Sequence, residues 1–321
     1  MNSVYFRIIF VFIDLVLPLV TGYYLKKTGH MHDKNCNLMM KINVVGLCTF
    51  LTFLSFWALH LSKQLLWLPV LGILFTILPG ILGAATFARS FSDYLERGAY
   101  IVSCMLSNLG VLAGLSAFIL YGEAGYAYVQ LVATPQNMLL VILCFPIAQY
   151  YAAKQQATEA KTRIKLSFRE MFLTKNQIPL LGMLAGILLQ LNGVARPAIL
   201  ETVFKNMVHF GAWFALLPVG YLIDFGRASE YYHRVLSQLF LRFFILPVFF
   251  YFLMKNFFTD QVLLGTILLC AAAPTGINAV IAAQMYSLKV DLTIASFLTS
   301  TAVYIILFPL FFVYVATKCS L

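Results

Sequence analysis

Two short polar stretches interrupt apolar sequence and carry residue types that can bind an anion. They contain Ser107, Asn108 and Gly110 in the first stretch, and Pro274, Thr275, Gly276 and Asn278 in the second. Proline removes a backbone donor and clashes with the preceding helical turn, while glycine tolerates bent backbone. Each stretch therefore predicts a helix divided into two halves, and the N-terminus of a half-helix offers free N–H groups to an anion. A simple kink with no ligand nearby is the alternative interpretation.

A third polar patch lies in "ATPQNML", where Gln136 and Asn137 are adjacent. Their amides could contact a ligand at the interrupted helices. Alternatively, they could form hydrogen bonds between neighbouring helices of a bundle.

Two ionisable residues stand inside otherwise apolar segments: Asp14 in 8–25 and Arg242 in 235–254. A charge in lipid is costly and indicates a functional or paired residue. The two could form a structural ion pair, or Arg242 could attract an anion while Asp14 carries a proton. A further charged row, Glu201, Lys205 and His209, recurs every four residues and predicts either a surface ion-pair row or an outer vestibule that guides anions.

The composition determines the class of element that must position these residues. Hydrophobic residues make up 61% of the 321-residue chain and charged residues 11%, whereas soluble domains average about 45–50% and 25%. Eight stretches contain no Lys, Arg, Asp or Glu, and two more contain a single charge. The charge-free stretches are 42–62, 64–88, 98–122, 124–153, 176–195, 206–223, 261–288 and 292–317. Most are long enough to cross a bilayer as helices, so the sequence predicts an all-α membrane protein with ten transmembrane helices.

The basic residues predict the orientation. If loops alternate between the two sides, 15 Lys and Arg residues share the side of the loop 154–175 and six share the other side. The side with more basic residues is expected to be cytoplasmic, which places both termini on the outer side of the cell membrane. This explains the net charge of +10 without nucleic acid as a partner.

The long basic segment 154–175 separates five predicted helices (1–153) from five others (176–321). An odd number of spans per half inserts two homologous halves in opposite orientations, which is a recurring plan in secondary transporters. Sliding one half by 166 residues superposes Cys104 on Cys270 and Gly110 on Gly276. The sequence therefore predicts two inverted five-helix repeats with broken helices four and nine.

These motifs resemble the auxin efflux carrier family of secondary transporters, which includes plant hormone exporters and bacterial permeases for malate and malonate. The similar segments are "VLPLVTGYYLKKTGHM", "SNLGVLAGLSAFILYGEAGYAY", "NQIPLLGMLAGILLQLNGVARPAIL", "LFLRFFILPVFF" and "APTGINAVIAAQMYSLKVDLTIASFLTSTAVYIILFPLF". The predicted second helix departs from the family because it lacks the usual proline. The resemblance implies a fold related to bile acid–sodium symporters, with a scaffold domain and a transport domain in which helices four and nine cross. It also implies a substrate site at Asn108 and Asn137, and often a homodimer.

The sequence thus predicts a secondary transporter of a small organic anion. The chain contains no HExxH, GxSxG or Walker motif, so we expect neither an enzyme nor ATP-driven transport. The cysteines lack metal-ligand spacing, and no metal or cofactor is expected. Coupling to a proton or Na⁺ gradient stays open. Two rival hypotheses are a Na⁺-coupled symporter of a larger amphipathic anion and a non-transporting membrane receptor or assembly subunit.

Overall fold

The computed structural model describes residues 12–59, 63–157, 178–222 and 229–318, and every regular element in these ranges is helical. In the first half these are η1 (Phe12–Val16), α2 (Leu17–Lys27), α3 (Asp33–Lys41), η2 (Ile42–Cys48), α4 (Thr49–Ala58), η3 (Lys63–Leu66), α5 (Trp67–Ala85), η4 (Phe87–Ser90), α6 (Tyr94–Met105), η5 (Leu109–Ala113), α7 (Gly114–Leu139), η6 (Leu140–Cys144) and α8 (Phe145–Ala157). In the second half they are α10 (Ile178–Leu191), α11 (Ile199–Leu222), η8 (Ser229–Tyr231), α13 (Leu236–Phe240), η9 (Leu241–Ile245), α14 (Leu246–Met254), α15 (Gln261–Ala271), α16 (Ile277–Met285) and α17 (Val290–Lys318).

Five helices in the described ranges are long and apolar enough to cross a membrane. They are Asp33–Ala58, Trp67–Ser90, Leu109–Gln136, Leu236–Met254 and Val290–Phe311, and Leu181–Leu191 and Gln261–Ala271 are shorter apolar helices. The predicted all-helical membrane class is therefore confirmed at this level. The ten-span inverted repeat stays a prediction.

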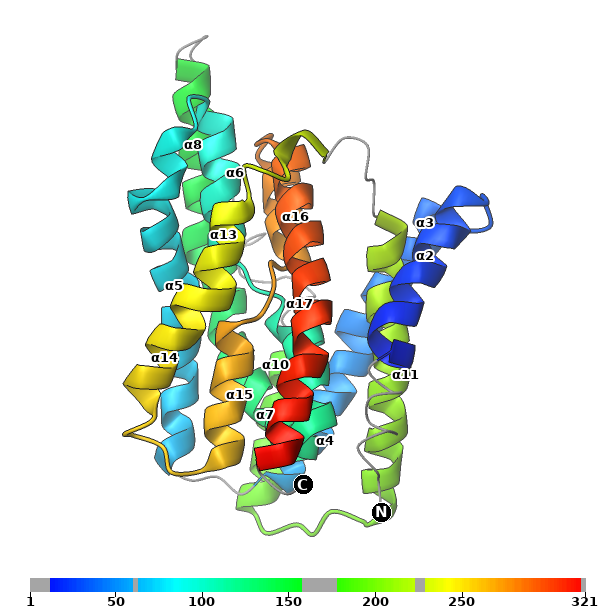
Figure 1. Ribbon diagram of the computed structural model, residues 1–321. Coiled ribbons are helices and arrows are strands. Elements are labelled where there is room, and N and C mark those ends of the chain that lie inside the picture. Colours follow the sequence, from blue (N-terminus) through cyan, green and yellow to red (C-terminus); the bar gives the residue numbers. More distant parts are fainter. Residues whose placement is uncertain (1–11, 60–62, 158–177, 223–228, 319–321) are drawn as a thin grey trace.

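Both polar stretches interrupt a helix. The chain leaves α6 after Met105 and resumes helix at Leu109, and it leaves α15 after Ala271 and resumes at Ile277. Figure 1 shows α6 and α16 in its upper half and α15 and α7 in its lower half. Apolar helices that stop at mid-height leave backbone groups unpaired, and these groups need partners inside the protein.

The helices form two groups, named here for use below. In the first group α2 packs on α11 and α4 packs on α10, whereas the second group contains α5 to α8 and α13 to α17. The principal contact between the groups is that of α4 with α7. In Figure 1, α2, α3 and α11 line one side of the molecule and α5, α13 and α14 line the other. We call the boundary between the two groups the seam.

Two boundaries differ in detail from the sequence prediction. Helix α7 passes through Gly122, whose φ of 67° and ψ of −152° produce a sharp kink where we expected one span to end. Helix α8 continues to Ala157, four residues into the predicted linker. The rest of that linker, 158–175, lies outside the described residues.

Candidate functional site

The two interrupted segments cross and pair through their backbones. Ser107 and Thr275 form an isolated antiparallel bridge. The Asn108 N–H donates to the Pro274 carbonyl at 2.7 Å, and the Gly276 N–H donates to the Leu106 carbonyl at 2.8 Å. These bonds satisfy groups that the helices leave open and fix one break against the other.

Glycine at position 276 is required by the closeness of this crossing. A Cβ on Gly276 would lie 2.9 Å from the Ser107 carbonyl oxygen and 3.0 Å from its carbon. The backbone angles, φ −81° and ψ 152°, are ordinary for any residue. Steric contact, rather than backbone conformation, therefore selects glycine here.

Three side chains complete the hydrogen bonding of the crossing. Gln136 donates to the Ser107 carbonyl at 2.7 Å, and the Thr275 N–H donates to the Ser300 hydroxyl at 2.9 Å. Gln238 donates at 2.8 Å to the Ser103 carbonyl and to the Thr275 hydroxyl. Gln136, a predicted site residue, thus contacts the backbone of the break.

Arg242 lies beside the carbonyl ends of both interrupted helices and is 0% exposed. Its guanidinium donates to the carbonyls of Ser103, Cys104 and Leu106 at 2.7, 2.9 and 3.0 Å, at the end of α6. It also donates to the Ala273 carbonyl at 2.9 Å and to the Ser107 hydroxyl at 2.7 Å. Helix C-termini carry partial negative charge, so a buried cation is stabilised at this position.

The opposite ends of the same crossing are the N-termini of η5 and α16. The Asn108 carboxamide oxygen accepts from the Leu112 N–H at 3.4 Å and caps η5. Gly276 precedes α16 without a side-chain cap, and Asn278 is half-buried in the first turn. No hydrogen bond of the Asn278 side chain is found within the described ranges. These helix ends are suited to a negative group.

A small cavity of about 30 Å³ lies in the seam next to the crossing. The second group contributes Leu115, Tyr126 and Gly110, where an added Cβ would meet no atom within 4 Å. The first group contributes Asn43, which is 5% exposed and makes no hydrogen bond within the described part of the chain. Asn43 lines this cavity, where a ligand or a water molecule could form a hydrogen bond with its amide.

Sequence reasoning missed Asn43. The available signal was a lone Asn at the start of the charge-free stretch 42–62. Its position opposite Gly110 depends on how the two groups lie on either side of the small cavity, which no sequence pattern specifies.

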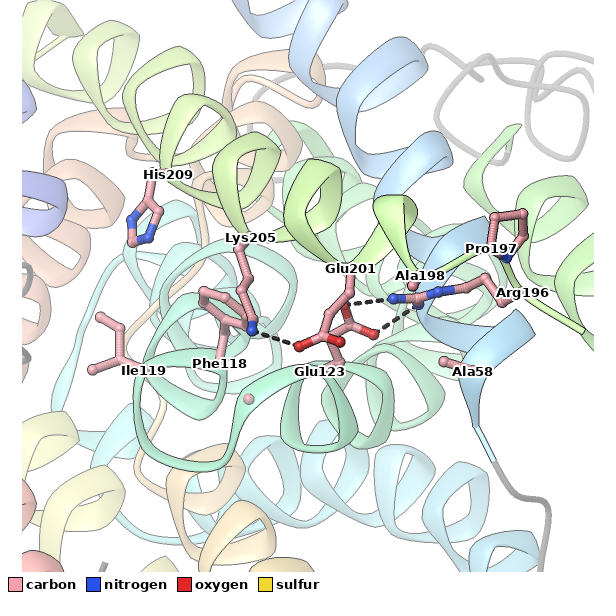
Figure 2. A pocket seen from close by; sticks show the side chains of 11 residues that line it. Ala58, Phe118, Ile119, Glu123, Arg196, Pro197, Ala198, Glu201, Lys205 and His209 are labelled. Atoms are coloured by element: carbon pink, nitrogen blue, oxygen red, sulfur yellow. Dashed lines mark hydrogen bonds and ion pairs between the residues drawn. The ribbon is translucent and has the colours of Figure 1, made fainter. Parts of the chain in front are cut away.

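A larger cavity of about 610 Å³ occupies the same seam (Figure 2). Arg196 donates to both carboxylate oxygens of Glu123, at 2.7 and 3.0 Å, and joins the first group to the second. Glu201 and Lys205 form an ion pair whose side chains are more than half exposed. His209 lies farther along α11 on the same wall, as Figure 2 shows. The charged row on α11 therefore lines a cavity.

Asp14 and Arg242 do not pair with each other. The Asp14 carboxylate contacts Nδ1 of His209, and Asp14 is 2% exposed. Arg242 is surrounded by carbonyls instead, so the two charges belong to different sites.

The structure brings most of the predicted substrate-site residues together. Those that lie at or beside the crossing are Ser107, Asn108, Gly110, Gln136, Pro274, Thr275, Gly276 and Asn278. The Asn137 side chain lies outside the described part of the structure.

Comparison with known proteins identifies the family. No curated protein matches the chain. A family model described as a membrane transport protein matches residues 7–312, nearly the whole sequence, and includes both interrupted helices. This confirms the resemblance drawn from the sequence motifs. The chain belongs to the membrane transport protein family, that of the auxin efflux carriers.

Proposed function

We propose that this chain, a membrane transporter by its family, is a secondary transporter of a small organic anion, a mono- or dicarboxylate such as malate or malonate. The observation that carries this proposal is the crossing itself, where the breaks before η5 and α16 pair with each other and the N-terminus of η5 lies beside a small cavity. A carboxylate there would accept hydrogen bonds from backbone N–H groups and from the amides of Asn278 and Asn43. Such interrupted helices near the middle of a membrane are the usual substrate site of secondary transporters.

We further propose an elevator-type movement, in which the second group carries the substrate and the first group is the scaffold. Both cavities lie in the seam, and residues of both groups line each of them. In this proposal ten spans form two inverted repeats, and the end of α8 with the basic segment after it faces the cytoplasm of the cell. The scaffold could also join two copies in a homodimer, as the resemblance implies.

The test is transport by purified protein in liposomes, with radiolabelled malate and malonate as the two probes. Asn278→Ala should lower uptake at least tenfold and leave the melting temperature unchanged, because its side chain has no hydrogen-bond partner among the described residues to lose. Asn206→Ala, the same change at an exposed position of α11, is the matched control.

Asn108→Ala is a less selective variant, because its side chain also caps η5. Its uptake is expected to fall together with about 1 kcal/mol of stability, the usual value of a helix cap. Wild-type rates in Asn278→Ala, with both probes transported, would remove the crossing as the binding site.

A further inference from the structure

The buried guanidinium of Arg242 occupies a cage of oxygen atoms. Four of its contacts are backbone carbonyls, of Ser103, Cys104, Leu106 and Ala273, and the fifth is the Ser107 hydroxyl, all at 2.7 to 3.0 Å. The four carbonyls come from the ends of two different helices, α6 and α15. Among the described residues no carboxylate forms an ion pair with Arg242.

Such a cage has the chemistry of a site for a small cation. Carbonyl oxygens and hydroxyls are hard ligands, and the C-terminal ends of half-helices carry partial negative charge. In secondary transporters with interrupted helices, carbonyls of this kind coordinate the coupling ion. Arginine does not lose its proton in proteins, so its positive charge is permanent.

We propose that Arg242 is a built-in cation, and that the crossing of this transporter requires no inorganic cation because the guanidinium fills the cage. The cage is then a latent site for a monovalent cation, exposed when the side chain is removed. The consequence, anion transport that is independent of Na⁺, rests on the proposed transport function. The occupation of the cage by Arg242 does not.

The helix that carries Arg242 also donates a second set of hydrogen bonds at the crossing. Gln238, one turn before Arg242, donates to the Ser103 carbonyl and the Thr275 hydroxyl, so two residues of the same helix donate to the end of α6. Within the described structure the Arg242 Nε is buried and without an acceptor. The guanidinium is therefore held by its two terminal nitrogen atoms, which are the atoms directed at the carbonyls.

The first experiment measures thermal unfolding of detergent-purified protein without substrate, in NaCl, KCl and choline chloride at equal ionic strength. Wild-type protein should unfold at the same temperature in all three salts. Arg242→Ala should unfold at a temperature lower by about 5 °C or more in choline chloride. Added Na⁺, or methylguanidinium at millimolar concentration, should recover a large part of the loss.

The control is Arg234→Ala, which removes a half-exposed arginine that forms an ion pair with Glu96 of α6. Its unfolding temperature should not respond to the choice of cation. If Arg242→Ala does not accumulate, Arg242→Lys and the wild-type protein decide the question. The lysine variant should fold and remain indifferent to Na⁺, since it keeps a fixed charge.

Three results would overturn the proposal: stabilisation of wild-type protein by Na⁺ over choline, wild-type stability of Arg242→Ala in choline, or a loss in that variant that no cation recovers. The second experiment is malate and malonate uptake by wild-type protein with Na⁺ replaced by choline, where equal rates are expected and a fall would contradict the inference. Absence of uptake in both salts would count against the proposed function and leave the unfolding result intact.

Discussion

At the residue scale, the crossing separates its charges by sign. Carbonyl ends of α6 and α15 meet the guanidinium of Arg242, while the N-terminus of η5 lies beside the small cavity. The same short segments thus present negative ends to a fixed cation and positive ends to space that an anion could enter. Most polar side chains at the crossing form hydrogen bonds with backbone groups. Asn43 and Asn278 have no hydrogen-bond partner among the described residues.

Two glycines of the crossing allow a matched comparison. In Gly276→Ala the new methyl group would press on the Ser107 carbonyl, so we expect a loss of about 1–3 kcal/mol in stability. In Gly110→Ala the methyl group meets no atom within 4 Å and instead enters the small cavity. That variant should keep its unfolding temperature and lose anion uptake. Similar stability losses in both variants would show that a methyl group at Gly110 also presses on packed atoms and that the cavity has no room for it.

Asn43 gives a second residue-scale prediction. Asn43→Leu replaces a buried side chain that has no hydrogen-bond partner in the described ranges, so the free energy of unfolding should stay the same or rise by up to about 1 kcal/mol. Uptake should fall, because the first group would lose this amide from the small cavity. Asn206→Leu, on the exposed face of α11, controls for a general effect of added apolar surface. A variant with lower stability would mean that Asn43 already has a partner.

At the element scale, close backbone contacts hold the first group together. A Cβ on Gly182 of α10 would lie 2.5 Å from the Thr49 carbonyl of α4, and Gly186 one turn later meets the Phe53 carbonyl. Small residues four apart allow two membrane helices to approach this closely, and lipid supplies no hydrophobic force to replace the contact. The α4–α10 pair therefore depends on shape.

Gly182→Ala should destabilise the protein by about 1–3 kcal/mol, because the nearest contacting atom is a backbone carbonyl oxygen that cannot rotate away. Gly46→Ala is the control, since a methyl group at that position would contact no atom within 4 Å. Unfolding followed by circular dichroism measures both. Equal stability of the two variants would contradict the close packing of α4 on α10.

At the scale of the whole molecule, the two helix groups meet along a seam with little contact outside α4 and α7. The Glu123–Arg196 ion pair crosses this seam, and its side chains are 17% and 11% exposed. Arg196 also donates to the Leu54 carbonyl of α4 at 2.9 Å. Relative movement of the groups would have to break the bonds between Arg196 and Glu123, whereas the bond to Leu54 stays within the first group. We therefore predict that the ion pair acts as a latch between the groups.

Glu123→Gln and Arg196→Gln should each cost about 1–2 kcal/mol, more than an exposed pair because the geometry is bidentate and partly buried. The exchange Glu123→Arg with Arg196→Glu should recover part of that loss. A double-mutant cycle on unfolding temperature measures the coupling, with Glu201→Gln and Lys205→Gln as the exposed comparison. Coupling no larger than in that exposed pair would exclude the latch.

The sequence alone determined the class of this protein and the places where its helices break. The composition indicates that lipid surrounds most of the chain. Lipid permits only helices or closed barrels, and the length of the charge-free stretches favours helices. Pro274 and the glycines at 110 and 276 then marked the interruptions, because proline removes a donor and glycine accepts what other residues cannot. Motif order also identified the family.

Only the tertiary structure decided which polar residues share a site. Asp14 and Arg242 look alike in sequence, as single charges in apolar helices. In the structure Asp14 contacts His209, whereas Arg242 donates hydrogen bonds to backbone carbonyls. Asn43 and Gly110 are far apart in the chain and face one cavity. Such partnerships depend on how helices pack across long sequence separations. Local propensity and hydrophobic pattern specify little of that packing, since several of these helices, such as α15, α16 and α17, are apolar on most faces and could meet either lipid or protein.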